Sequence, residues 1–517
     1  MDHPDVPQWP YQLDHCKVPS EAAIPKVDTF QDLVLKRDAD GRDLWRWIYG
    51  EVRAAILDGR LKPGMRLPSS RSLSVQYGVA RGTVVVAFEQ LHAEGYVKTE
   101  RGVGSRVSLQ LPQVVTRVAP SRHISSRGIS VRARRALEGA TPLPLGQSIG
   151  RAFRSYEPAI DQFPVEIWSR VASRVLRRAP RSLYGQGESG GYMPLRKAIA
   201  EYVGSSRGVR CSASQVIITA GAQQALDLLC RLLLEEGNEA WMEDPGYPGA
   251  RQAMRAAGIK PISVPVDNEG LIVTMGRELA AKAQLIYVTP SNQFPLGVTM
   301  SATRRMELIQ WAMTNNAWIV EDEYDAEYCY SGHPVASLHS LDRSGCVLYI
   351  GTFTKMLFNA LRLGFIVVPE QLIEPIELAR SFIDRHPPTL DQAILAEFIL
   401  DGHFGHHVRK MRNLYLERSQ LLLELGRKHL SGVLEIQEPE SGMKTVGWLK
   451  DQRSDASAAK RAQSVGLEVL PISGFSCEYH ARPGLMLGFA GCHEEEIRRG
   501  VHLLKSVLRE PERTLRR

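Results

Sequence analysis

The spacing of apolar residues predicts short helices near the start of the chain. The first presents one apolar face, which comprises Leu44, Ile48, Val52 and Ala55. This pattern stops at Gly59, a residue typical of a helix C-cap. After a turn that contains proline, Ser69 or Ser70 can cap a second helix that ends near Gly78.

A third helix is predicted after Val79, and two short strands follow it. Its inward-facing stripe comprises Val84, Ala87, Phe88 and Leu91. Arg81 and Thr83 precede this stripe and stay free at the helix N-terminus. Residues 95–99 and 105–108 are predicted strands joined by a glycine-rich turn. Three helices and a hairpin predict a winged helix-turn-helix, a fold that places its third helix in the major groove of DNA.

The pattern changes again beyond this region. Residues 110–145 hold six arginines against one acid, Glu138, which is typical of a solvated tether and also compatible with a tether that contacts DNA phosphates. We expect an N-terminal extension (1–42), a winged helix-turn-helix domain (43–109), this arginine-rich linker (110–145) and a large domain (146–510).

In the large domain, short apolar runs alternate with helical patterns. The runs comprise residues 216–219, 240–242, 285–288, 318–320, 347–350 and 365–368. This alternation predicts an α/β fold with a largely parallel sheet covered by helices. A long amphipathic helix from Val408 and the shorter segments after it predict a smaller C-terminal α/β subdomain.

Composition narrows the cellular setting. The chain has 517 residues, a formal net charge of +7 and seven cysteines without CxxC spacing. Scattered cysteines are typical of a reducing compartment, and the modest positive charge permits contact with nucleic acid. The N-terminus has no signal-peptide pattern, and no apolar stretch is long enough to span a membrane. We therefore expect a cytoplasmic protein.

Lys355 has the surroundings that an aldehyde cofactor needs. It follows the apolar run 347–350, and a lysine at a strand end can form a Schiff base with such a cofactor. The hydroxyls of Thr352 and Thr354 and the guanidinium of Arg362 can hold a phosphate group. These residues predict a pyridoxal 5'-phosphate site with Lys355 as its catalytic residue.

An acidic segment after the run 318–320 supplies the next requirement. Asp322 can keep a pyridine nitrogen protonated, and Tyr324 can donate to the ring hydroxyl. Taken alone, such a segment is more typical of a solvated turn. Its interpretation as part of a site depends on the other loops.

Three more loops follow predicted strands. Ala222 and Gln223 open an apolar helix, so their amides can bind an anion. Tyr247 can stack on a pyridine ring, although alone it is more typical of a packing residue. Asn292 is the polar side chain of its loop that can reach a cofactor. All these residues lie at the carboxyl ends of strands, where open α/β sheets bind ligands.

These motifs together resemble those of the MocR-type GntR regulators. In the DNA-binding part the resemblance rests on residues 59–71 and on 80–84 through 94–96, and in the large part on 221–224, 244–247, 321–325 and 354–355. It implies a winged helix-turn-helix joined to a domain similar to fold-type-I aminotransferases, with pyridoxal phosphate as cofactor.

The resemblance also implies roles for single residues. Lys355 corresponds to the Schiff-base lysine, Asp322 and Tyr324 contact the cofactor ring, Tyr247 stacks on it and Arg362 binds its phosphate. Tyr184 is expected to reach the phosphate of the partner subunit in a head-to-tail homodimer.

Three residues depart from the family pattern. Met486 stands where the family has the arginine that clamps an amino-acid carboxylate, and a thioether cannot form that ion pair. Lys444 stands where histidine is frequent and can supply a substitute cation. Asn292 also replaces a common histidine.

We therefore expect a regulator that binds a double-stranded DNA operator and senses an amine, an amino-acid-like molecule or the cofactor vitamer. The candidate DNA contacts are Arg71, Arg81, Thr83 and, in the wing, Arg101. The alternative is an active aminotransferase with a DNA-binding appendage, because its catalytic residues are present. No metal site is expected at the neighbouring His403, His406 and His407.

Overall fold

The computed structural model describes residues 43–100, 104–112, 128–137, 152–330, 335–451, 453–479 and 481–509. The chain divides into two compact units, Met1–Arg127 and Gly128–Arg517. Arg101 lies outside the described residues, as do Arg117, Arg122 and Arg127 of the linker. No helix within the described ranges is long and apolar enough to cross a membrane.

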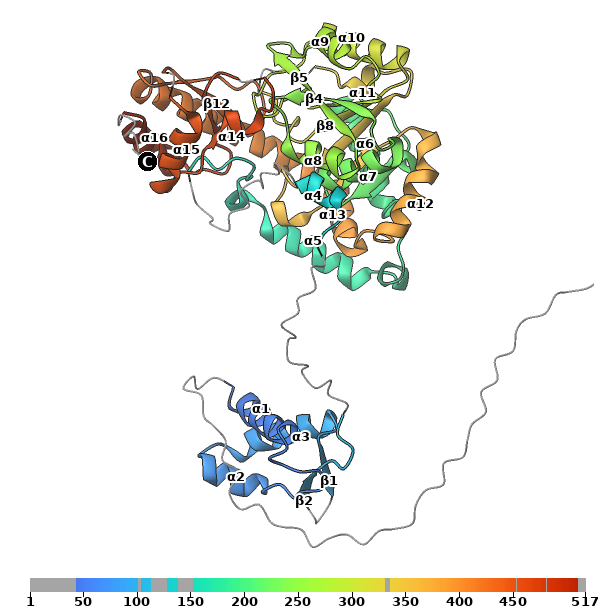
Figure 1. Ribbon diagram of the computed structural model, residues 1–517, viewed down its shortest axis with the longest axis vertical. Coiled ribbons are helices and arrows are strands. Elements are labelled where there is room, and N and C mark those ends of the chain that lie inside the picture. Colours follow the sequence, from blue (N-terminus) through green and yellow to red (C-terminus); the bar gives the residue numbers. More distant parts are fainter. Residues whose placement is uncertain are drawn as a thin grey trace, which may run out of the picture. The chain divides into compact units, whose positions relative to one another are not determined.

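The first unit is built from three helices and a hairpin (Figure 1). They are α1 (Leu44–Leu57), α2 (Ser70–Tyr77), α3 (Arg81–Ala93), β1 (Val97–Glu100) and β2 (Gly104–Val107). The Oγ of Ser69 caps α2 by accepting from the amide of Ser72 at 3.1 Å. The predicted inner stripe of α3 is buried as expected. The winged helix-turn-helix architecture is therefore confirmed.

The second unit contains an eight-stranded sheet. Its strands are β3 (Val216–Thr219), β4 (Glu239–Asp244), β5 (Lys260–Asp267), β6 (Gly270–Leu271), β7 (Leu285–Val288), β8 (Trp318–Glu323), β9 (Val347–Thr352) and β10 (Gly364–Val367). They lie in the order β3-β10-β9-β8-β7-β4-β5-β6. The central strands β9, β8, β7, β4 and β5 are parallel, as predicted.

One strand of this sheet departs from the parallel arrangement of its centre. β10 is antiparallel to both of its neighbours, β9 and β3. The connection from β9 to β10 is short and holds Lys355 and Arg362, so it lacks the crossover helix that a parallel pair requires. The chain therefore turns back at the strand end where the candidate site lies.

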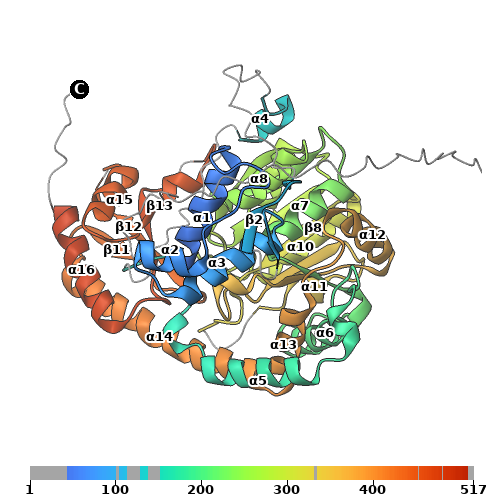
Figure 2. The ribbon, with the colours of Figure 1, turned by 90° about the horizontal axis from the view of Figure 1, so that it is seen from below.

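Helices cover both faces of the sheet (Figure 2). They are α5 (Val165–Arg178), α6 (Met193–Arg207), α7 (Ala222–Leu233), α8 (Pro248–Ala256), α9 (Val273–Leu279), α10 (Ala302–Thr314), α11 (Leu338–Leu341), α12 (Ile373–Ile383) and α13 (Thr389–Leu400). Alternate strand residues pack into different clusters. Ile217 packs in the core with α7 and α8, whereas Ile218 packs in the core with α6 and α13. A short helix, α4 (Val131–Leu137), packs against α8.

A smaller antiparallel sheet forms the C-terminal subdomain. Its strands β11 (Leu434–Ile436), β12 (Lys444–Leu449), β13 (Leu470–Pro471) and β14 (Gly484–Gly488) lie in the order β11-β12-β14-β13. Helices α14 (His403–His429), α15 (Asp455–Ser464) and α16 (Glu494–Arg509) belong to it. Figures 1 and 2 both show these elements to one side of the larger sheet. α14 begins at His403, five residues before the predicted start at Val408.

Two residues of α10 test the importance of the core. Leu308 is fully buried in the cluster formed with Ile286 of β7, whereas Met306 is 51% exposed. Replacing Leu308 with alanine should lower the free energy of unfolding by about 2–5 kcal/mol, because it removes buried methyl groups and leaves a cavity. Met306→Ala should change it by less than about 0.5 kcal/mol. Urea unfolding of the two variants measures the difference, and equal midpoints would contradict this packing.

Candidate cofactor site

Lys355 lies in the turn after β9 and is held by two oxygen atoms. Its Nζ donates to the backbone carbonyl of Tyr156 at 2.8 Å and to Oδ1 of Asn359 at 3.4 Å. Burial lowers the pKa of Lys355 to about 8, while the nearby carboxylate of Asp325 opposes this shift. At a pKa of about 8, roughly a tenth of the lysine is a neutral amine at pH 7, far more than for an ordinary lysine, and this neutral form is the nucleophile.

Asp322 lies on β8 with its carboxylate pointing into the protein. Its Oδ2 accepts from the hydroxyl of Tyr287, on β7, at 2.8 Å. Burial raises the pKa of Asp322 to about 7, while the Tyr287 hydrogen bond opposes this shift. A positive group against Asp322 would favour the ionised form.

The candidate phosphate cradle brings β3, α7 and the segment after β9 together. Arg362 donates to the carbonyl of Ala220 at 2.8 Å, and a Cβ on Gly221 would lie 3.4 Å from the Arg362 guanidinium. α7 begins at Ala222, and no side chain caps it. The amides of Ala222 and Gln223 thus stand at an uncapped helix N-terminus beside a cation, an arrangement suited to a phosphate.

Thr352 and Thr354 lie on the other side of the same loop. Both side chains are buried, and Oγ1 of Thr352 accepts from the amide of Thr354 at 3.2 Å. They are therefore fixed by the backbone turn that also carries Lys355.

Tyr247, which the sequence predicts to stack on the cofactor ring, lies next to Gln223 at the start of α7. It is the residue before α8, and its hydroxyl donates to Oε1 of Gln223 at 3.4 Å. Its ring lies 5.6 Å from that of Phe294 at nearly a right angle. Burial raises the pKa of Tyr247 to about 12, so the phenol stays neutral.

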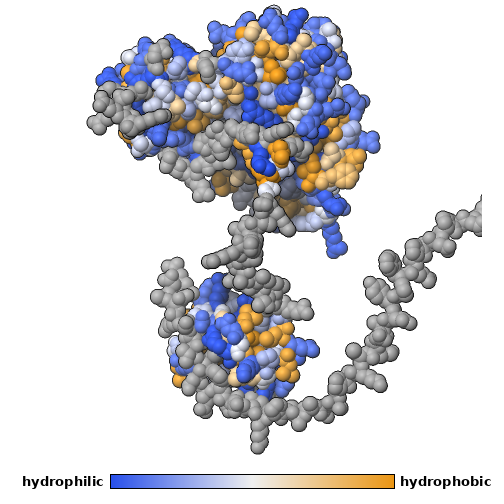
Figure 3. Space-filling model, viewed as in Figure 1, coloured by the Kyte–Doolittle hydropathy of each residue, from blue (hydrophilic) through white to orange (hydrophobic). Residues whose placement is uncertain are grey.

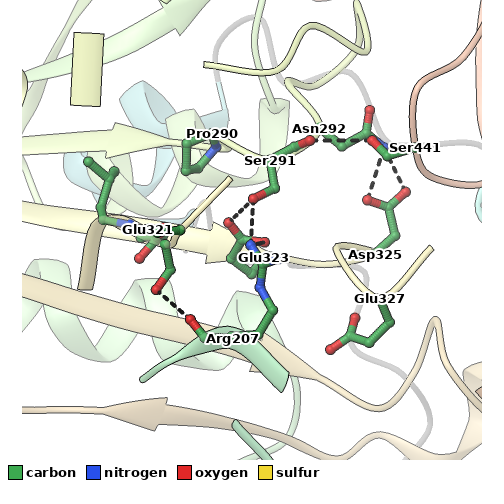
Figure 4. A network of polar contacts seen from close by, with 12 residues as sticks. Arg207, Pro290, Ser291, Asn292, Glu321, Glu323, Asp325, Glu327 and Ser441 are labelled. Carbon is green, nitrogen blue, oxygen red and sulfur yellow. Dashed lines mark hydrogen bonds and ion pairs between the residues drawn. The ribbon is translucent and has the colours of Figure 1, made fainter. Parts of the chain in front are cut away.

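Asn292 and Tyr324 connect two loops at the edge of the site, and Figure 4 shows Asn292 beside Asp325. The Asn292 amide donates to both carboxylate oxygens of Asp325, at 2.9 and 2.8 Å. The Tyr324 hydroxyl donates to the backbone carbonyl of Asn292 at 2.7 Å. Gly442 lies so close that a Cβ there would be 2.0 Å from the Asn292 amide nitrogen. The loop before β12 therefore packs directly against Asn292 and Asp325.

A buried ion pair is connected to the loop that carries Asn292. Arg207 contacts Glu323 at 3.1 Å, and the Ser291 hydroxyl donates to the other oxygen of Glu323 at 2.5 Å. Figure 4 shows Ser291, next to Asn292, leading from this pair to the Asn292 and Asp325 contact. The position of Asn292 is thus tied to a charge pair in the interior.

Other candidates are placed elsewhere. The ring of Tyr184 is 60% exposed, and its hydroxyl donates to the carbonyl of Leu176 rather than to any residue of the site. In the first unit, Arg71 and Arg81 are exposed and Thr83 is partly exposed, all near the start of α2 or α3. Arg81 lies 3.4 Å from the Ser70 hydroxyl.

Sequence reasoning missed Tyr156, Tyr287 and Asp325. Tyr287 fell inside an apolar strand pattern, where a tyrosine is normally a packing residue. Asp325 belonged to the recognised acidic segment but had no signal that set it apart. Tyr156 holds Lys355 through a backbone carbonyl, which no side-chain pattern can indicate.

The residues present fit pyridoxal phosphate. Among the described residues, Asp322 Oδ1, Thr354 Oγ1 and Asn292 Oδ1 are buried without a hydrogen-bond partner. Buried polar atoms usually have partners, so atoms left open at one site indicate a place for a polar ligand. When bound, the cofactor supplies an aldehyde for amines and a ring that withdraws electrons. Lys355 would hold the aldehyde, Asp322 the ring nitrogen and Arg362 the phosphate.

Comparison with known proteins finds two family matches in the chain. Residues 45–107 match the gntR family of bacterial regulatory proteins, and residues 155–504 match aminotransferase class I and II. The probable rhizopine catabolism regulatory protein MocR of Rhizobium meliloti is 40% identical over 484 residues, which cover 92% of this chain and 95% of that protein. The pyridoxine biosynthesis regulator PdxR of Corynebacterium glutamicum is 30% identical, covering 87% and 92%.

Solved structures extend the comparison to the second unit. A kynurenine aminotransferase of Pyrococcus horikoshii is 26% identical with a TM-score of 0.66, covering 75% of this chain and 97% of that chain. The α-aminoadipate aminotransferase LysN of Thermus thermophilus, solved with a phosphopyridoxyl-leucine ligand, is 29% identical with a TM-score of 0.64, covering 73% and 94%.

The fold and these matches define a DNA-binding transcriptional regulator with an aminotransferase-like domain of fold type I. The chain belongs to the MocR-type subfamily of the GntR regulators. Its cofactor is pyridoxal 5'-phosphate.

The lowered pKa of Lys355 predicts how cofactor capture depends on pH. Only the neutral amine is nucleophilic, so the rate at which cofactor-free protein gains visible absorption should rise with pH and level off above about 8. Asp325→Asn removes a charge that raises this pKa, so the midpoint should move to lower pH. Stopped-flow absorbance measures both.

The controls are two lysine variants. Lys355→Ala should give no such absorption at any pH, whereas Lys282→Ala, which changes an exposed lysine, should match the unmodified protein. A midpoint near the ordinary lysine pKa of about 10.4 would contradict the burial of this amine.

Proposed function

We propose that the second unit senses a small amine or amino-acid-like molecule through Lys355 and that binding changes the DNA affinity of the first unit. One observation carries this proposal: a buried lysine with a lowered pKa, Lys355, and a DNA-binding unit occur in the same chain. A ligand can shift DNA affinity only if it interacts differently with two states of the protein. Release of Lys355 by a competing amine provides such a difference.

The contacts of Lys355 support this coupling. A released ammonium group must be stabilised by nearby acceptors, and the nearest are the carbonyl of Tyr156 and Oδ1 of Asn359. Tyr156 belongs to the segment that follows the expected linker (110–145) in the sequence. A change in the charge of Lys355 therefore acts directly on this segment.

A second path runs through α8. Tyr247 stands at the N-terminus of this helix, and α4, within the segment expected to be the linker, packs against it. A ligand that moves the ring of Tyr247 would therefore bear on α8 and, through it, on α4.

We further propose a cytoplasmic, head-to-tail homodimer, in which Tyr184 reaches the phosphate group bound by the partner subunit. Exposed apolar side chains support an interface. On α12, Leu378, Phe382 and Ile383 are exposed, Phe382 to 83%, and apolar residues gather over this helix in Figure 3. The phenol of Tyr184 is exposed and therefore accessible to a partner.

The sensing proposal is tested by measuring DNA affinity with cofactor across a panel of amines and amino acids. An effector should change the dissociation constant about 5- to 150-fold, the range typical of coupled sites. Lys355→Ala should abolish the response, while Lys282→Ala should preserve it. Unchanged affinity for every ligand, with and without cofactor, would remove the sensing function.

The same titration separates two other possibilities. If pyridoxal phosphate alone changes DNA affinity and no amine adds to it, the cofactor vitamer is the signal. The assembled Lys355 and Asp322 also support an alternative, amino-group transfer by an active aminotransferase. Repeated turnover of an amino acid with a 2-oxo acid, without any effect on DNA binding, would favour that alternative.

The DNA contact of α3 is tested with Arg81→Ala. This side chain is exposed at the helix N-terminus and is proposed to contact DNA together with Arg71, Thr83 and Arg101. Loss of one phosphate contact should weaken binding and reduce the slope of log affinity against log salt by about 1. Arg498→Ala on α16 removes the same charge elsewhere and should leave the slope unchanged. Equal slopes for both variants would exclude Arg81 from the DNA surface.

A further inference from the structure

An apolar wall stands beside Lys355. We define it as Phe294, Val446, Ile472, Phe475 and Met486, which form one buried cluster. The partly buried rings of Tyr156, Tyr247 and Tyr324 pack against it. The Nζ of Lys355 lies 5.4 Å from the centroid of the Tyr156 ring, so a molecule attached near Lys355 meets the rings that pack against this wall.

Met486 lies at the centre of the wall. It is fully buried on β14, where it pairs with Val446 of β12 and with Leu470 of β13. Its sulfur accepts weakly from the hydroxyl of Tyr156 at 3.7 Å, and the backbone carbonyl of Tyr156 holds Lys355. Met486 is thus one residue away from the reactive amine, and its thioether offers no charge to an anion.

The described cations around the site are engaged elsewhere. Arg362 is directed to the carbonyl of Ala220 in the phosphate cradle. Lys444 is fully enclosed, with its Nζ 5.3 Å from the ring centroid of Phe294 and 3.4 Å from the carbonyl of Pro295. Burial lowers the pKa of Lys444 to about 8, and the Asp325 carboxylate opposes this shift. The charge of Lys444 is thus balanced by Asp325.

Carboxyl groups already crowd the same region. Burial raises the pKa of Glu243 and Asp322 to about 7 and that of Asp325 to about 6. Neighbouring carboxylates raise each of them further, Asp322 acting on Glu243 and Glu323 acting on both aspartates. A further carboxylate would add like charge in a buried place where the described cations Arg362 and Lys444 already have partners, which is strongly unfavourable.

We propose that the ligand of this site is a primary amine without a carboxylate on the carbon that bears the amine. This inference rests on the proposed function and names the class of effector. The acid-rich surroundings attract the ammonium form of such a molecule, and the apolar wall accepts the hydrogen that replaces its carboxylate. The wall therefore selects against ordinary amino acids.

The test uses pairs of ligands that differ only in this carboxylate: 2-phenylethylamine with phenylalanine, and ethanolamine with serine. The cofactor-loaded protein is titrated with each at pH 7.5, and binding is followed by the change in visible absorption and by calorimetry. In each pair that binds, the amine should bind at least about tenfold more tightly, a difference of about 1.4 kcal/mol. An amino acid that binds as tightly as its amine, or absence of binding in both pairs, would overturn the inference.

Two substitutions at the wall sharpen the result. Met486→Arg supplies the missing cation and should reverse the preference toward the amino acid of each pair. Met486→Leu keeps an apolar side chain of similar size and should leave the preference unchanged. A reversal in the leucine variant would contradict the role of charge. If the arginine variant fails to fold, the unmodified protein still decides the question through the paired ligands.

DNA affinity, measured with the same ligands, keeps the two proposals distinct. If amines bind preferentially without altering DNA affinity, the result contradicts the proposed sensing and supports the proposed ligand class. If amino acids bind preferentially and alter DNA affinity, the ligand class falls and the sensing stands.

Discussion

The structure of the second unit depends on the burial of an acidic segment at the end of β8. Five carboxyl groups occur between residues 321 and 327, and all are buried. Each carboxylate must be paired with a donor or a cation, or lose its charge, because an unpaired charge in the interior is strongly unfavourable. Glu321 accepts from the amides of Leu338 and His339 at 2.7 and 2.9 Å. Glu323 pairs with Arg207 at 3.1 Å. These partners lie on different elements. The hydrogen bonds and the ion pair of the β8 carboxylates therefore hold α11, α6 and the loop after β7 around the site.

The same burial has opposite effects on the two groups nearest the chemistry. It lowers the pKa of Lys355 to about 8 and raises that of Asp322 to about 7. Both shifts favour the neutral forms, since the low-dielectric interior disfavours either charge. The pKa values of the two groups therefore both lie near neutral pH, that of Lys355 from above and that of Asp322 from below. A ligand that brings or removes one charge can change the protonation of each, which an exposed lysine and aspartate would not allow.

Much of the fold could be predicted from local patterns, and the exceptions have physical reasons. The cap at Ser69 and the strand limits of β7 followed from side-chain chemistry and hydrophobic runs, which are local. β5 was not predicted because Pro261 and Pro265 lie within it, and proline argues against a strand. The antiparallel direction of β10 could not be predicted, because the alternation of strands and helices carries no information on a tight return of the chain. In the site, residues that follow strands could be predicted from topology, whereas a backbone carbonyl such as that of Tyr156 could not.

The segment around Tyr156 shows why such a contact can still be precise. Phe153 and Tyr156 both adopt left-handed backbone conformations, with φ of 70° and 73°, which are costly for bulky residues. They persist because the segment is held on several sides. The Gly488 amide on β14 donates to the carbonyl of Phe153 at 3.0 Å, and the Ala159 amide donates to the Tyr415 hydroxyl on α14 at 3.0 Å. A Cβ on Gly488 would lie 2.1 Å from the carbonyl oxygen of Arg154, so only glycine allows this approach. Lys355 is therefore anchored to a segment that the C-terminal subdomain holds in place, and a shift of Tyr156 cannot be absorbed without moving β14 or α14.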